Sequence, residues 1–73
     1  MRGAIDLALD YYQRATAADE HHSEAQYNFA VLLERLGRPD DARPHYLKFL
    51  RDAPPEYAHL FDAVRAKLAQ PTQ

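Results

Sequence analysis

The 73-residue chain contains no cysteine and no tryptophan. The absence of cysteine excludes disulfide bonds and thiolate zinc sites, and nothing in the sequence points to an oxidising compartment. A chain this short forms one domain at most, and folding buries only about 60% of the surface that the unfolded chain exposes. Small domains usually gain stability from a disulfide, a metal or a partner chain, and here the first of these is excluded.

Long runs of one kind of side chain are also lacking. The 9 Lys and Arg residues and the 11 Asp and Glu residues are spread along the chain, and the net charge is −2, so nucleic-acid binding has little support. The apolar runs are too short for a membrane-spanning helix. Asp6 and Asp10 interrupt the N-terminal apolar stretch, which argues against a signal peptide. The default expectation is a cytoplasmic protein with no membrane partner.

Apolar residues recur at helical spacing in four segments, and the boundaries between the segments are marked. The first segment runs to about Ala18. The second starts at Ser23, where Gln26 three residues later has the spacing of a capping box, and it stops at Gly37. The sequence therefore predicts a helix between residues 23 and 36.

Prolines indicate where the helices of the second half of the chain begin or bend. Pro39 suits the first position of the third helix, whereas Pro44 is expected to delay the start of that helix or to bend it. A fourth helix is expected over residues 56–70. The predicted fold class is all-α, with four helices joined by tight turns and no strands.

The chain also matches itself at an offset of 34 residues. The matching pairs are Gly3 with Gly37, Asp6 with Asp40, Ala8 with Ala42, Tyr12 with Tyr46, and Arg14 with Lys48. A period of 34 with helix–turn–helix content resembles the tetratricopeptide repeat (TPR) family. The stretch "EAQYNFAVLLERLGRPDDA" is similar to the family throughout, although Gln26 replaces the usual tryptophan and Leu33 the usual tyrosine.

The resemblance implies how a single domain, residues 1–73, is divided. Residues 2–22 form the second helix of an incomplete repeat and a linker, residues 23–55 a complete repeat, and residues 56–70 a capping helix. The small residues Ala30 and Ala42 are expected to let two helices approach closely. Because repeats bury their apolar faces against neighbours, either a longer array or a homodimer is expected to cover the first helix.

The resemblance also implies a function, which is to hold a peptide or partner helix on the concave face of the repeats. The expected partner-binding residues are Glu24, Tyr27, Asn28, Val31, Glu34, Arg35, Phe61 and Arg65. The alternative is a structural self-association element with no separate ligand. Its expected contact residues are Leu7, Leu9, Tyr11 and Tyr12.

Catalytic and metal-binding functions have weaker support. The sequence contains no recognisable catalytic motif and no Gly-rich phosphate loop, so no enzyme activity and no cofactor are expected. His21 and His22 are adjacent, and neighbouring side chains point in different directions and rarely bind one ion together, so no metal site is expected. Of the paired tyrosines, Tyr12 is expected in the core and Tyr11 at the surface or an interface.

Overall fold

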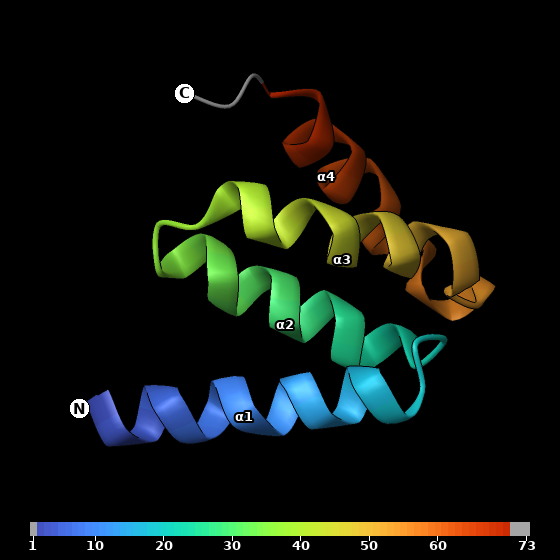
Figure 1. The fold of residues 1–73 in the computed structure, drawn as a ribbon. Coiled ribbons are helices and arrows are strands. Elements are labelled where there is room, and N and C mark those ends of the chain that lie inside the picture. Colours follow the sequence, from blue (N-terminus) through green and yellow to red (C-terminus); the bar gives the residue numbers. More distant parts are fainter. Residues whose placement is uncertain (1, 71–73) are drawn as a thin grey trace.

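The structure is a computed structural model that describes residues 2–70. Within that range it contains α-helices and one short 3₁₀ turn, and no β-strand (Figure 1). The elements are α1 (Arg2–Ala18), α2 (Ser23–Arg35), α3 (Pro39–Asp52), η1 (Pro55–Tyr57) and α4 (Ala58–Ala69). The all-α prediction with four helices is therefore confirmed for the described residues.

The helices stack in chain order. Consecutive helices α1, α2 and α3 run in opposite directions and lie side by side, and α4 crosses α3 at the far end of the stack (Figure 1). The closest packing is between α2 and α3. None of the helices in residues 2–70 has the length and apolar character needed to cross a membrane.

The turn between α2 and α3 follows from Gly37. This glycine adopts a φ of 75°, a left-handed conformation that other residues reach only with strain. The amide of Gly37 donates to the carbonyl of Glu34, and the amide of Arg38 donates to the carbonyl of Leu33, which is the Schellman pattern. Pro39 then occupies the first turn of α3, as predicted.

The predicted capping box at Ser23 is wrong. The N-cap of α2 is His22, whose Nδ1 accepts a hydrogen bond of 3.2 Å from the amide of Ala25. Ser23 lies inside the helix, and the side chain of Gln26 is fully buried. Gln26 turns toward the linker and α3, where it finds partners for both ends of its amide, so it does not reach back to the helix start.

The effect of Pro44 and the start of the last helix also differ from prediction. Helix α3 begins at Pro39 and continues through Pro44, so the expected delay at Pro44 is wrong. The missing N–H of Pro44 removes one intrahelical hydrogen bond without ending the helix. The last helix begins at Ala58, because the preceding residues Pro55–Tyr57 form the tighter 3₁₀ turn η1.

The core lies between α2, α3 and α4. Its buried hydrophobic residues are Phe29, Ala30, Leu33, Ala42, Tyr46, Phe49 and Val64. Ala30 and Ala42 are both 0% exposed, in agreement with the prediction that small residues let α2 and α3 approach closely. Leu9 and Tyr12 of α1 pack against this cluster, as do Leu60 and Phe61 of α4.

Candidate functional site

Helix α2 carries a row of side chains that are not fully buried in the core. Glu24, Tyr27, Asn28, Val31 and Arg35 follow one another at helical spacing, so they share one face of the helix. Glu24 and Arg35 are exposed, and the three residues between them are half-buried. We call these five residues the α2 face.

Three hollows surround the α2 face. The Arg35 hollow, of about 420 Å³, is lined by Ala8, Tyr12, Tyr27, Asn28, Val31, Leu32 and Arg35. The Tyr57 hollow, of about 170 Å³, is lined by Glu24, Tyr27, Asn28, Phe49, Tyr57 and Leu60. The Tyr11 hollow, of about 260 Å³, is lined by Tyr11, Tyr12, His22, Glu24, Ala25 and Asn28. The five residues of the α2 face therefore all border at least one hollow.

Asn28 is the residue common to all three hollows. Within residues 2–70, the hydrogen bonds of the structure leave its side-chain amide without a partner, and this amide is not among the fully buried atoms. An asparagine amide can donate and accept at once. A partner bound in the hollows would therefore find one side chain that can both donate and accept a hydrogen bond.

Aromatic side chains form the walls beside Asn28. Tyr27 lies 5.1 Å from Phe49 and 6.2 Å from Tyr46, measured between ring centroids. Tyr12 stacks on Phe29 at 6.1 Å, with 21° between the ring planes. Each of these tyrosines therefore packs on an aromatic ring of the core.

Glu34, predicted to bind a partner, is already engaged within the chain. Its Oε1 accepts hydrogen bonds from the Tyr46 hydroxyl at 2.7 Å and from Lys67 Nζ at 2.9 Å. Burial acts to raise the pKa of Glu34, but the hydrogen bonds of Tyr46 and Lys67 and the Lys67 charge outweigh it and lower the pKa. Glu34 therefore links α2 to α3 and α4.

Phe61 and Arg65 lie on α4, away from the three hollows. Phe61 is half-buried and meets Phe49 edge to face at 6.0 Å. The Arg65 guanidinium carbon lies 5.9 Å from the centre of the Phe61 ring, and its Nη1 lies 3.4 Å from Asp62. These two predicted residues are close to each other and separate from the α2 face.

The predicted self-association residues divide between two environments. Leu9 and Tyr12 pack against the core, whereas Leu7 is 72% exposed and Tyr11 is 64% exposed. Leu7 and Tyr11 are one helical turn apart on α1, and the rings of Tyr11 and Tyr12 lie 5.4 Å apart. Tyr11 therefore stands at the surface and Tyr12 against the core, as predicted.

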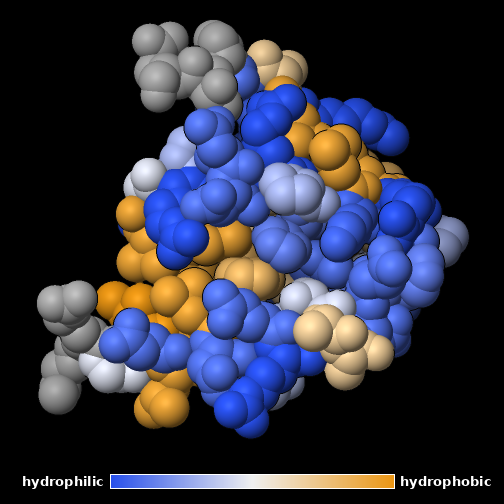
Figure 2. Space-filling model, in the orientation of Figure 1, coloured by the Kyte–Doolittle hydropathy of each residue, from blue (hydrophilic) through white to orange (hydrophobic). Residues whose placement is uncertain are grey.

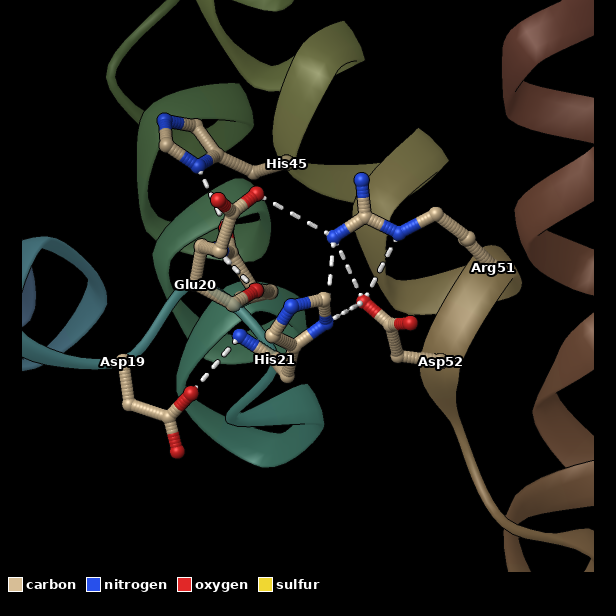
Figure 3. Close-up of polar contacts among 7 residues, drawn as sticks. Asp19, Glu20, His21, His45, Arg51 and Asp52 are labelled. Atoms are coloured by element: carbon tan, nitrogen blue, oxygen red, sulfur yellow. Dashed lines mark hydrogen bonds and ion pairs between the residues drawn. The ribbon is translucent and has the colours of Figure 1, made fainter.

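The linker histidines have structural partners (Figure 3). His21 Nδ1 donates to Asp52 Oδ2 at 2.9 Å, and Arg51 joins the same Asp52 oxygen at 2.7 Å and Glu20 at 3.3 Å. The Arg51 hydrogen bond, with a smaller contribution from His21, lowers the pKa of Asp52 against the opposing effect of burial. This cluster ties the linker after α1 to the end of α3.

His45 belongs to a more buried cluster. Its Nδ1 donates to Gln26 Oε1 at 2.6 Å, while Gln26 Nε2 donates to the Glu20 carbonyl at 3.0 Å. The His45 ring lies 4.3 Å from Phe29, and burial, with the charge of Lys48, lowers the pKa of His45 despite the opposing charge of Asp41. Among residues 2–70, no group of three residues is arranged to hold a metal ion.

Sequence reasoning missed several residues that line the three hollows, and three of them come from other helices or turns than α2 and α3. Ala8 comes from α1, Tyr57 from η1 and Leu60 from α4. All three are half-buried, so they touch both the interior and the surface. A two-way division of residues into buried and exposed does not reveal such positions.

Comparison with known proteins agrees with this helical arrangement. The family model described as tetratricopeptide repeat matches residues 1–70, which is nearly the whole chain. No curated protein and no solved structure matches it. Tetratricopeptide repeats are generally non-catalytic modules of protein–protein interaction. The chain therefore belongs to the tetratricopeptide repeat family.

Proposed function

We propose that this chain is a non-catalytic module that holds an extended peptide on the α2 face. The observation that carries the proposal is Asn28, a half-buried amide that borders three hollows and has no side-chain partner within residues 2–70. A peptide backbone offers the complementary N–H and C=O groups. An extended segment suits this amide better than a helix, because a helix uses its backbone groups internally.

The walls of the hollows support the same proposal. Tyr12, Tyr27 and Tyr57 offer apolar ring surface with a hydroxyl at the edge, which suits contact with the side chains of a peptide. Val31 adds an aliphatic surface in the Arg35 hollow. The expected recognition is therefore one backbone contact at Asn28, with side chains seated on either side of it.

The test is a selection of peptides from a random display library against the 73-residue chain, followed by affinity measurements on purified peptides. Asn28→Ala is expected to weaken binding of the selected peptides about fivefold or more, because a lost hydrogen bond to a partly buried group costs roughly 1–3 kcal/mol. Gln13→Ala, a change of an exposed amide on α1, serves as the matched control and is expected to bind normally. Equal affinity of the selected peptides for the Asn28→Ala chain would refute the proposal.

A second candidate function is self-association through α1. The supporting observation is that Leu7 and Tyr11 expose 72% and 64% of their surface on one side of that helix. Large apolar side chains grouped in this way are typical of interaction surfaces. A second copy of the chain is the proposed occupant, with the two α1 helices packed together.

Sedimentation equilibrium over a hundredfold range of protein concentration tests self-association. A dimer is expected to form at high concentration and to be lost when Leu7 and Tyr11 are both changed to Ser. The control is Leu47→Ser on α3, since Leu47 is also 55% exposed but lies away from α1. A monomeric mass at every concentration would exclude this candidate.

A further inference from the structure

The two ends of the α2 face carry opposite charges. Glu24 borders the Tyr57 and Tyr11 hollows, and Arg35 borders the Arg35 hollow. They are 11 residues apart, which is three helical turns, so both point to the same side and are separated by about 16 Å along the helix axis.

Both charged groups are available to a partner. The ion pairs formed within residues 2–70 use neither Glu24 nor Arg35, whereas the neighbouring Glu34 is bonded to Lys67. Both residues are exposed, and each stands at the rim of a hollow. A charged group at the rim of a binding surface contributes more to the choice of partner than to the strength of binding.

We propose that the α2 face selects peptides that carry two opposite charges, an acidic residue at the Arg35 end and a basic residue at the Glu24 end. An extended chain advances about 3.3 Å per residue, so a separation of about 16 Å corresponds to about five residues. The segment between the two charges carries an apolar side chain for the Arg35 hollow and passes its backbone over Asn28. This inference rests on the proposed function and adds the charge order and spacing of the ligand.

The experiment uses four capped six-residue peptides that differ only at their terminal side chains, with leucine and serine between them. Two mixed peptides carry Glu at one end and Lys at the other, in the two possible directions, a third has Glu at both ends, and a fourth has Lys at both ends. Binding to the full chain is followed by NMR chemical-shift titration at low salt. The wild-type chain is expected to bind one mixed peptide about two- to fivefold more tightly than either like-charged peptide, the range for exposed ion pairs.

Charge variants of the protein sharpen the test. Arg35→Glu makes both ends of the face acidic and is expected to prefer the Lys–Lys peptide. Glu24→Lys makes both ends basic and is expected to prefer the Glu–Glu peptide. The double variant is expected to prefer a mixed peptide again, now in the opposite direction. The control is Arg43→Glu on α3, which changes the net charge by the same amount as Arg35→Glu. Arg43 borders none of the three hollows, so this variant is expected to rank the peptides by affinity as the wild-type chain does.

The outcomes separate this inference from the proposed function. An unchanged order of peptides in all charge variants, combined with weaker binding of every peptide by Asn28→Ala, would overturn the charge order and leave the proposed function standing. The proposed charge order would also be overturned if Arg43→Glu changed the affinity ranking of the peptides as much as Arg35→Glu does. Net charge alone would then explain the preference. Failure of all the peptides to bind at millimolar concentration would overturn both. Circular dichroism of each variant confirms that the helices are retained.

Discussion

The phenol of Tyr46 donates a hydrogen bond of 2.7 Å to the carboxylate of Glu34, which lies one helix away across the tightest packed pair of the structure. The Tyr46 side chain is 2% exposed, so its hydroxyl has little access to water. Burial and the neighbouring carboxylate raise the pKa of Tyr46, which keeps the phenol protonated as a donor. Lys67 completes the group from α4.

Removing this hydroxyl is expected to destabilise the chain. In Tyr46→Phe the ring stays in the core but the partly buried Glu34 loses a donor, so the free energy of unfolding should fall by about 1–2 kcal/mol. Urea denaturation followed by circular dichroism measures the difference. Tyr27→Phe is the matched control, since the Tyr27 hydroxyl has no hydrogen bond within the described residues, and it should change stability much less. Equal losses in the two variants would contradict this role of Glu34.

Stability is expected to depend on the protonation of His45. Its pKa in the folded chain lies below the ordinary value of about 6.5, so the unfolded state binds the proton more tightly. The contribution of His45 to stability is therefore complete above pH 6.5 and is lost as the pH falls through the lowered pKa. His45→Gln should flatten the profile of unfolding free energy between pH 7 and pH 5. A profile of equal slope in wild type and His45→Gln would rule out this dependence.

Gln26 is expected to be one of the most sensitive polar positions. Its side chain is 0% exposed and is hydrogen-bonded to His45 and to the Glu20 carbonyl. Gln26→Ala would leave both partners without a bond and open a gap, so a loss of about 2–3 kcal/mol is expected. Thermal unfolding compared with Gln13→Ala measures this loss. A Gln26→Ala chain as stable as wild type would show that water replaces the amide without penalty.

Replacing each of the two glycines by alanine is expected to change the stability of the chain in opposite directions. Gly37 has a φ of 75°, so Gly37→Ala should destabilise the turn by about 1 kcal/mol, although a new Cβ would meet no atom within 4 Å. Gly3 lies in α1 with the same open space and ordinary helical backbone, so Gly3→Ala should stabilise the chain by up to about 1 kcal/mol. Paired thermal melts decide the matter, and the prediction fails if both changes act in the same direction.

Much of the fold could be predicted from local chemistry. The stop at Gly37 and the start at Pro39 depend on residues within one helical turn, and the offset of 34 residues is a period along the chain, so all three are visible in the order of residues. The close contact at Ala30 and Ala42 was predicted through the resemblance to the tetratricopeptide repeat, and both residues are fully buried.

The candidate site was only partly predictable. The resemblance to the tetratricopeptide repeat implied that Glu24, Tyr27, Asn28, Val31 and Arg35 share one face, and all five border hollows in the structure. The same resemblance gave no means of separating Glu24, which is exposed, from Glu34, which is hydrogen-bonded to two other helices. Whether this face binds a peptide stays a prediction.

The sequence by itself determined the helices, their turns and the family to which the chain belongs, because these depend on neighbouring residues and on a period along the chain. Only the tertiary structure decided which polar side chains are already hydrogen-bonded to other residues of the chain. Tyr46 and Lys67 reach Glu34 from 12 and 33 residues away, and His45 reaches Gln26 from 19 residues away. Such pairs form because packing removes water from both groups, which then need each other as hydrogen-bond partners. Residues this far apart in the chain leave no local sequence pattern that predicts the pair.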